Sequence, residues 1–436
     1  MDRRNFLKAS LIGAGALTLS GAGAPPAFAA RKKNVPSAIQ PQGWVSEPSR
    51  KIPVVASVDL VVVGGGPAGV SAAISAARNG ISVLLLERYA FLGGLWTGGL
   101  VLPVLSTHGL DQAGEWTKCI YGFAHELCSR LFDMGMALNP KDPTADPEAA
   151  KYVMEQMIQE AGVQVIYNST AADVLMSGNR ITAVVLETQA GRLAVNTKAV
   201  VDASGDGDVM AWSGEDFYQI RYPIGAMWRV GGIAENMKGG TRTPIPGVRV
   251  MHSGGVPDLD GLDVFNNTKV WMQLRQEMWE RTGKLRSREG GENAFLLETP
   301  PQMGVRITRV LKPVRSVTLE ESMHYTSYPD SIGMSGGSNT IKYKGQSVKK
   351  KERPVWQIPY GAIVPKKVKN LLVAGRCFGF DEGLVWDARE IGTCFVTGQA
   401  AGNAAALAVL NRCSVQDVDV ASLQKLLKDQ NAKLSL

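Results

Sequence analysis

The chain has 436 residues, 45% hydrophobic and 20% charged, which is the composition of a globular protein long enough to bury at least one large core. Its formal net charge is +7, a mild excess that suits an anionic cofactor or substrate; because no basic helix is interleaved with aromatic residues, we do not expect nucleic acid as a partner. The five cysteines contain no C-x-x-C and the four histidines are scattered, which excludes the usual zinc and iron–sulfur patterns, so we expect no metal site.

The N-terminus has the layout of a twin-arginine signal peptide. "RRNFLK" (3–8) precedes a short apolar run, and Ala27 and Ala29 frame an A-x-A cleavage site, so we expect cleavage after Ala29. The alternative is an ordinary secretion signal with a chance arginine pair. The twin-arginine export machinery moves folded proteins, which suits a chain that must first bind a cytoplasmic cofactor. We therefore expect a periplasmic or secreted protein, with no stable membrane anchor because no apolar run reaches the ~18 residues that span a bilayer.

A βαβ unit follows a polar, proline-bearing linker. "DLVVV" (59–63) is a continuous β-branched run, typical of a strand buried on both faces of a parallel sheet. "PAGVSAAISAARNG" (67–80) predicts a helix that ends at Gly80, and "ISVLLL" (81–86) predicts a second buried strand.

The turn between the first strand and the helix carries a dinucleotide fingerprint, Gly64, Gly66 and Gly69 in G-x-G-x-x-G spacing. Gly64 permits the tight turn, Gly66 lets a pyrophosphate approach the backbone, and Gly69 lets helix and strand pack closely. The helix N-terminus supplies free N–H groups and a positive dipole end. Glu87, at the end of the second strand, should accept hydrogen bonds from ribose hydroxyls and would repel a 2′-phosphate, which disfavours NADP. The alternative is a glycine-rich turn without a ligand.

The remaining chain alternates between helical and strand patterns. We expect residues 105–160 to be mainly helical and residues 163–205 to form strands that include a hairpin. The region from 216 to 355 is mixed, with a helix over 264–283. "NLLVAG" predicts a further buried strand, and residues 391–410 predict a long helix of small residues.

Four motifs together carry a family resemblance: "GGGPAG" (64–69), "LGGLWTGG" (92–99), "VDASGDGD" (201–208) and "NLLVAGRC…TGQAAG" (370–402). With them the sequence resembles the FAD-dependent oxidoreductase family of the glutathione-reductase-type fold, over most of residues 55–410. The resemblance implies an α/β protein in which a Rossmann-like FAD-binding domain carries an inserted α+β substrate domain, and it implies FAD held non-covalently in an extended pose.

The resemblance and the patterns suggest eight segments, three of which together form the FAD-binding domain. These are a twin-arginine signal peptide (1–29), a linker (30–54), a first FAD-binding segment (55–105), a helical insert (106–160), a second FAD-binding segment (161–215), a substrate or cap domain (216–355), a third FAD-binding segment (356–412) and a C-terminal tail (413–436).

The resemblance also implies a set of FAD-binding residues. They are Gly64, Gly66, Pro67, Ala68, Gly69, Glu87, Arg88, Gly93, Gly94, Asp206, Gly375, Arg376, Thr393 and Gln399. Glu87 and the fingerprint glycines would hold the adenosine and pyrophosphate side, and Asp206 would lie near the ribityl chain or the pyrophosphate. The helix that starts near Gly392 should direct its positive dipole end at the isoalloxazine, which stabilises the anionic reduced flavin. Gln399 could instead face solvent or a neighbouring helix.

The stretch "RCFGFDEGLVWDARE" (376–390) departs from the family pattern. Members of the family often carry His-Glu here, followed six residues later by Arg; the Arg falls on Arg389, but His-Glu becomes Glu382-Gly383. Arg389, with Arg306 and Arg309, could bind an anionic substrate or stabilise negative charge. Glu382 could be a base if burial raises its pKa, or could form a structural ion pair with Arg389. His324 is a rival base.

The sequence therefore predicts an exported FAD-dependent oxidoreductase, a dehydrogenase or reductase, that transfers a hydride between FAD and a small substrate that could be anionic. Because NAD(P)H is scarce outside the cytoplasm and the chain has one fingerprint, we expect a quinone, a cytochrome, O₂ or a second substrate as the electron partner. The alternative is a non-catalytic or relay flavoprotein subunit. A closed pocket over the flavin would favour the enzyme, and a flat exposed flavin edge would favour the relay.

Overall fold

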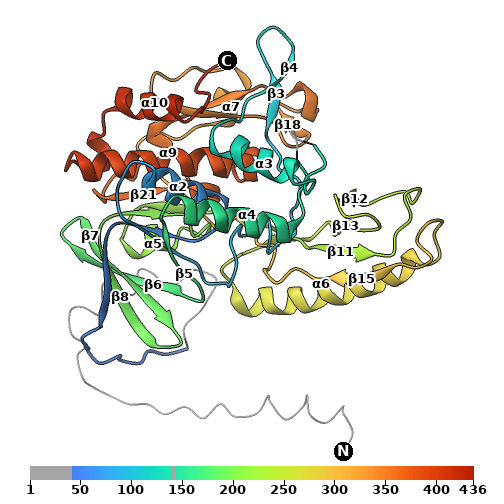
Figure 1. Ribbon diagram of the computed structural model, residues 1–436, viewed down its shortest axis with the longest axis horizontal. Helices are drawn as coiled ribbons and strands as arrows, with labels where there is room; N and C mark the ends of the chain where they lie inside the picture. Colours follow the sequence, from blue (N-terminus) through green and yellow to red (C-terminus); the bar gives the residue numbers. More distant parts are fainter. Residues whose placement is uncertain (1–41, 140–142) are drawn as a thin grey trace, which may run out of the picture. The chain divides into compact units, whose positions relative to one another are not determined.

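The computed structural model describes residues 42–139 and 143–436 (Figure 1). The expected signal peptide and the first part of the expected linker, residues 30–41, lie outside these residues. Within the described portion of the linker, residues 42–53 form neither helix nor strand, and the first strand, β1, starts at Val54.

A seven-stranded sheet is the framework of the fold, with the order β5-β2-β1-β8-β7-β6 and with β21 also paired to β8. The strands are β1 (Val54–Val63), β2 (Val83–Leu86), β5 (Gln164–Ile166), β6 (Thr170–Ser177), β7 (Arg180–Thr188), β8 (Gly191–Asp202) and β21 (Leu371–Val373). Five of these strands pair with one another in parallel: β5, β2, β1, β8 and β21. In contrast, β7 pairs antiparallel with both β6 and β8. The first half of β8 pairs with β7 and its last residues pair with β21.

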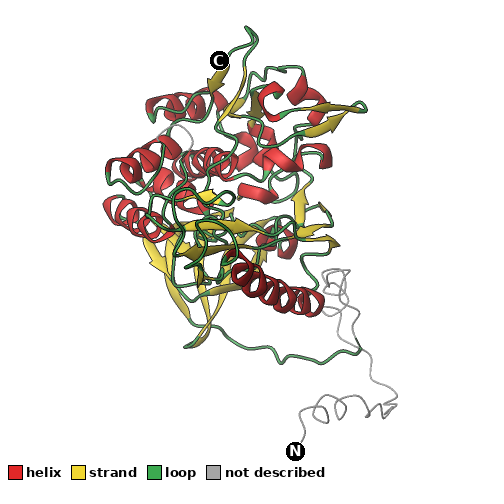
Figure 2. Ribbon diagram, turned by 90° about the vertical axis from the view of Figure 1, so that its right-hand side faces the viewer, coloured by secondary structure: helices red, strands yellow, loops and turns green. Residues whose placement is uncertain are grey.

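Both faces of this sheet are buried, which explains the continuous apolar run in β1. Leu60 and Val62 belong to the core cluster that includes residues of the helices α2 (Pro67–Ala77) and α9 (Ile391–Leu410). Val61 and Val63 belong to a second cluster on the opposite face, with residues of β6 and β7. Because successive side chains of a strand point to opposite faces, a strand covered on both sides must be apolar throughout. Figure 2 shows the helices gathered above the strands of this sheet.

The helices α2 and α9 pack closely because their contact is made by small residues. A Cβ added to Gly398 would lie 2.2 Å from the carbonyl oxygen of Ala68, and one added to Gly402 would lie 2.1 Å from that of Ala72. By length and composition α9 could cross a membrane, but 83% of its apolar window is buried inside the protein. We therefore interpret α9 as the core helix of this fold.

The close contact between α2 and α9 predicts that a single added methyl group lowers the free energy of unfolding substantially. Gly402→Ala should destabilise the protein by about 1–3 kcal/mol or more, because backbone blocks the added methyl group and the helices must separate. The matched control is Gly283→Ala in the surface helix α6 (Val264–Leu285), where an added Cβ has no heavy atom within 4 Å. That control should be neutral or stabilising by up to ~1 kcal/mol. Equal thermal unfolding temperatures for the two variants would contradict this account of the packing.

A smaller lobe has its own sheet and core. Its four-stranded sheet has the order β12-β13-β11-β15 and packs against α6 (Figure 1). The strands are β11 (Met227–Gly231), β12 (Thr241–Arg242), β13 (Arg249–His252) and β15 (Phe295–Glu298). Its core cluster of buried residues extends from Ile224 to Ala294. The expected substrate domain, 216–355, is therefore wider than this lobe, because apolar residues from Ile307 to Val355 pack into the main core instead.

Residues 106–160 are not mainly helical, which corrects the expected helical insert. A hairpin of β3 (His108–Leu110) and β4 (Trp116–Lys118) precedes the helices α3 (Phe123–Asp133) and α4 (Pro147–Glu160). The hairpin turn is fixed by Asp111, whose carboxylate accepts hydrogen bonds from the backbone N–H groups of Ala113 and Glu115 at 3.0 and 2.8 Å.

The predicted C-terminal tail, residues 413–436, packs on the main core. The helix α10 (Val420–Asp429) buries Leu423 and Leu427, and Leu434 beyond it is buried as well. Its apolar residues follow the helical spacing of an amphipathic helix, so residues 413–436 close the main core rather than leaving it.

Short elements connect these regions. They are α5 (Asp208–Trp212), β9 (Phe217–Gln219), β10 (Tyr222–Ile224), β14 (Val256–Leu259), β16 (Arg309–Leu311), α7 (Leu319–Met323), β17 (Ser331–Ser335), β18 (Ile341–Tyr343), β19 (Gln346–Val348), β20 (Trp356–Pro359) and α8 (Val385–Ala388).

Candidate active site

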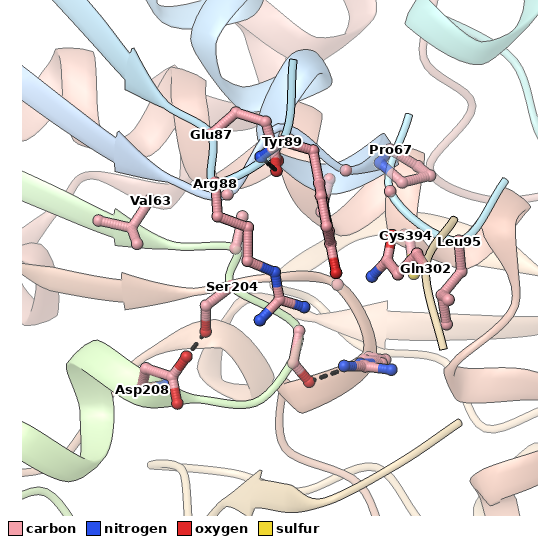
Figure 3. A pocket seen from close by; sticks show the side chains of 18 of the residues that line it. Val63, Pro67, Glu87, Arg88, Tyr89, Leu95, Ser204, Asp208, Gln302 and Cys394 are labelled. Atoms are coloured by element: carbon pink, nitrogen blue, oxygen red, sulfur yellow. Dashed lines mark hydrogen bonds between the residues drawn. The ribbon is translucent and has the colours of Figure 1, made fainter. Parts of the chain in front are cut away.

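A cavity opens at the carboxyl ends of the parallel strands (Figure 3). Val63 of β1, Leu86 of β2 and Ala203, which follows β8, line it. The ends of parallel strands are where open α/β sheets bind their ligands.

The glycines of the fingerprint shape one wall of the cavity. Gly64 has φ +99°, and a Cβ there would lie 2.5 Å from the carbonyl oxygen of Ala203; a Cβ on Gly69 would lie 1.7 Å from the carbonyl oxygen of Gly64. Gly66 is different, because a Cβ there would meet only the Cα of Gly94, at 3.9 Å. The protein thus leaves open space in front of Gly66, at the point where α2 begins without a side-chain cap. A phosphate group fits such a position.

The end of β2 supplies an acid and a base to the same cavity. Glu87 is 5% exposed, and its carboxylate accepts hydrogen bonds from the N–H groups of Gly65 at 2.7 Å and Tyr89 at 2.8 Å. Burial raises the pKa of this carboxyl. Figure 3 shows the Arg88 side chain extending across the cavity toward Ser204.

The loop after β8 is held by Arg376 at the opposite wall. The guanidinium of Arg376 donates to the carbonyl oxygen of Gly205 at 2.7 Å and to the Asp206 carboxylate at 2.7 Å. Asp206 also accepts a hydrogen bond from Thr308 at 2.8 Å. Arg376 lines the cavity, whereas Asp206 does not, so Asp206 orders the loop from behind.

Arg309 is committed to the same loop. It donates to the backbone oxygen of Asp206 and to the carboxylate of Asp208, both at 2.9 Å. Asp208 lines the cavity, and burial, together with the charges of Asp206 and Asp202, raises its pKa to about 6. Arg309 thus already pairs with a protein carboxylate, and it does not belong to the lining of the cavity.

At the far end of the cavity lies the N-terminus of α9, where Ile391 and Cys394 line the wall with Arg389 and Gln302. Gln302 is 8% exposed, and its Oε1 has no hydrogen-bond partner among the described residues; the same holds for Nε of Arg389. Two unsatisfied polar atoms on one wall are unfavourable unless a ligand pairs with them. Together with the space at Gly66, they fit a long cofactor with polar edges, such as FAD.

A cluster of cationic and aromatic side chains continues from Arg389. Its guanidinium lies over the rings of Tyr222 and Trp386, at 5.7 and 5.4 Å from their centroids. Arg306 donates to the carbonyl oxygen of Pro223 at 2.8 Å, and burial, followed by the nearby charge of Arg389, lowers the pKa of Arg306.

This cluster carries more positive than negative charge. Its carboxylate is Glu390, 3.3 Å from the Arg389 guanidinium and 4% exposed, and burial raises the pKa of that carboxyl. The Tyr222 hydroxyl is buried beside the Arg389 guanidinium, and burial raises its pKa to about 12. Two guanidinium groups and a hydroxyl donor against one buried carboxylate favour negative charge at this place.

Comparison with known proteins identifies the family. The model of a family described as FAD dependent oxidoreductase matches residues 59–221 and 221–427, most of the chain. The chain belongs to the FAD-dependent oxidoreductase family. It is thus an FAD-binding enzyme of mixed α/β fold.

Individual relatives of this FAD-dependent oxidoreductase match over shorter stretches. A thiamine thiazole synthase of Methanococcus aeolicus is 29% identical over 160 residues, which is 34% of this chain and 55% of the relative. Digeranylgeranylglycerophospholipid reductase 2 of Methanothermobacter thermautotrophicus is 30% identical over 160 residues, 34% of this chain and 39% of the relative. The chain thus spans about half the length, or less, of these curated relatives.

Solved structures match over most of the length. A geranylgeranyl bacteriochlorophyll reductase-like protein of Thermoplasma acidophilum has a TM-score of 0.46 at 14% identity, covering 86% of this chain and 83% of that one. The p-nitrophenol 4-monooxygenase of Pseudomonas putida has a TM-score of 0.47 at 12% identity, covering 86% and 85%.

The structure brings most of the sequence-predicted FAD residues of the oxidoreductase into the cavity lining. Those in the lining are Gly64, Gly66, Pro67, Ala68, Glu87, Arg88, Gly94, Gly375 and Arg376. Gly69, Gly93, Asp206, Thr393 and Gln399 lie outside it. Thr393 is fully buried and donates to the backbone of Asp387, and Gln399 faces helix neighbours, where it accepts from the N–H of Phe123 and donates to Gln430.

Neither of the two predicted bases lies in the cavity. Glu382 is exposed, and Arg389 pairs with Glu390 instead of Glu382. The His324 side chain is 57% exposed, and its Nδ1 lies 2.9 Å from the carbonyl oxygen of Glu320 on α7. Of the four predicted catalytic residues of the oxidoreductase, Arg389 and Arg306 remain at the site.

Sequence reasoning missed Tyr222, Trp386 and Gln302. Tyr222 begins a short strand that contains none of the four motifs, and Gln302 lies four residues before Arg306, also outside them. Trp386 lies three residues before Arg389 within the stretch 376–390, so one helical turn in α8 could have pointed to it.

Proposed function

We propose that this oxidoreductase transfers a hydride between FAD and a small anionic substrate. One observation carries the proposal: the cationic cluster of Arg306, Arg389 and the buried Tyr222 hydroxyl adjoins the α9 end of the cavity, where Arg389 belongs to the lining. When bound there, FAD would accept or donate the hydride. We further propose a glutathione-reductase-type FAD domain, which the β1–α2–β2 unit, the parallel β21 and the antiparallel β6–β7 hairpin support.

The cofactor would be held by residues on three sides of the cavity. Gly66 and the uncapped start of α2 would receive the pyrophosphate, and Glu87 would receive the ribose hydroxyls. The N-terminus of the 20-residue α9 would face the ring system, where its positive dipole end favours negative charge.

The chain's own groups would then orient the substrate. The planar guanidinium of Arg389 can hold a carboxylate through two parallel hydrogen bonds, and its position over the Tyr222 and Trp386 rings fixes its plane. Tyr222 keeps its proton at neutral pH, because burial raises its pKa to about 12, and so donates a hydrogen bond to the anion. As electron partner we propose a quinone, a cytochrome, O₂ or a second substrate.

Small anions that do not react test this site. Acetate and benzoate should perturb the flavin absorbance spectrum saturably, because a carboxylate bound at Arg389 lies beside the cofactor. Acetamide and benzamide have the same shapes without the charge and should bind at least about tenfold more weakly, which is the value of one charged hydrogen bond. If the acids and the amides changed the flavin spectrum at the same concentrations, that result would overturn the proposed anion site.

Export is a separate proposal, supported by the sequence of residues 1–29. Replacing Arg3 and Arg4 together by lysine should abolish export, because the receptor of the twin-arginine route reads the guanidinium pair. Cell fractionation and immunoblotting would measure it. The double variant at wild-type levels in the periplasm would contradict the assignment.

A further inference from the structure

The surface helix α6 carries an exposed apolar stripe. Phe265, Met272 and Trp279 are 71, 67 and 69% exposed. They are seven residues apart, so they lie on one side of the helix, in a line about 21 Å long. The opposite side packs into the core of the small lobe through residues such as Leu274 and Met278, and Figure 1 shows the lobe's strands on one side of α6 only.

Basic side chains flank this stripe. Lys269 and Arg275 lie three residues before and after Met272, one on each side, and Lys284 follows in the last turn. None of these three forms an ion pair within the residues that the structure describes, and the guanidinium of Arg275 lies over a ring, that of Trp271, at 5.8 Å.

The acidic residues of α6 offset only part of this charge. Glu277 pairs with Arg281 at 2.8 Å. Glu280 stays charged, because its hydrogen-bond partner at 2.8 Å, Gln276, is neutral, so the two glutamates leave the four basic residues of α6 in excess. The stripe is therefore an apolar ridge between basic margins, on a helix whose other side is fixed to a folded lobe.

We propose that this face of α6 docks on an anionic phospholipid surface. Phe, Met and Trp side chains on one side of a helix, bordered by Lys and Arg, suit the boundary between headgroups and acyl chains. The straight line of the three side chains lets the helix axis lie in the membrane plane. A second copy of the chain fits less well, because a symmetric contact would bring basic margins against basic margins. The proposal is independent of the anionic substrate.

Vesicle co-sedimentation of the full-length, FAD-loaded protein tests it. The vesicles contain phosphatidylcholine alone or with roughly 30% phosphatidylglycerol. The test variant is Phe265→Gln, Met272→Gln and Trp279→Gln combined. The matched control replaces Phe132, Met134 and Leu138 by glutamine, since these apolar residues are 40, 46 and 46% exposed elsewhere on the surface. All variants keep the same N-terminus, so its contribution to lipid binding is shared.

The wild type and the control should bind the anionic vesicles equally and more strongly than the neutral ones, and the α6 variant should bind at least about tenfold more weakly. Lys269→Gln and Lys284→Gln should each weaken vesicle binding about fivefold. If the triple variant does not fold, these two single variants test the proposal in its place. Binding that the α6 changes leave intact, or no preference for anionic vesicles, would overturn the proposal. A wild-type dimer that the triple variant converts to monomer, without vesicle binding, would assign the face to a second copy instead.

Discussion

Gly66→Glu should yield a folded but colourless protein. The structure leaves open space in front of Gly66, with the Cα of Gly94 as the near neighbour of an added Cβ, at 3.9 Å. A longer acidic side chain therefore enters the cavity instead of clashing with the fold, and its charge lies where the pyrophosphate should sit. Repulsion between these anions, added to lost space, should reduce FAD content to near zero. Flavin absorbance per chain, with the thermal unfolding temperature, measures the effect, and we expect the apoprotein to be retained in the cytoplasm.

Gly66→Ala is the matched control for this variant. It adds the Cβ without the charge, so it should fold and keep at least some of its FAD. A yellow Gly66→Glu protein with normal flavin absorbance would contradict the placement of the cofactor.

Arg389→Met should slow substrate-driven flavin reduction by about 10²–10³-fold while FAD stays bound. Methionine keeps the length of the side chain and its contact with the aromatic rings but removes the charge and both hydrogen bonds to a carboxylate. The acetate titration of the flavin spectrum should weaken to a similar degree, which gives a readout that does not depend on the substrate. Stopped-flow reduction under anaerobic conditions measures the first effect.

Two further variants test whether the effect comes from the charge and shape of Arg389. Arg389→Lys retains the charge without the planar fork and should be intermediate. Glu382→Gln changes an exposed carboxylate outside the cavity and should leave reduction unchanged. Wild-type kinetics in Arg389→Met, or a loss of rate in Glu382→Gln equal to that of Arg389→Met, would move the substrate site away from the cluster.

The FAD half of the site could be predicted from the sequence because its determinants are local. The fingerprint turn, the β-branched run of β1 and the acid after β2 lie within 30 residues, and their spacing alone requires a strand, a tight turn and a helix. The long helix of small residues predicted over 391–410 is α9, and the contacts of Gly398 and Gly402 with α2 explain why these residues are small.

The substrate half depends on contacts between distant segments. Tyr222, Arg306 and Arg389 come from three regions of the chain, and only the folding of β10 and α8 against the end of the cavity brings them together. The contacts of Arg309 and Asp206 also join distant segments. Arg309 binds Asp208 and Arg376 binds Asp206, and both pairs hold the loop after β8. A histidine was a candidate base, yet His324 lies on the surface because the end of α7 exposes it.

The hairpin at 108–118 was missed for a related reason. A side-chain turn at Asp111 determines it, and such a turn gives no periodic apolar signal.

The central claim is that this oxidoreductase exchanges a hydride between bound FAD and an anionic substrate. Anaerobic titration of the purified yellow protein with a panel of small carboxylates and their methyl esters tests it directly, with flavin absorbance as the readout. We expect at least one carboxylate to bleach the flavin, and its ester, which lacks the charge but keeps the reacting carbon, to do so at least about 10²-fold more slowly. Equally fast bleaching by the ester, or reduction only by uncharged compounds, would contradict the claim.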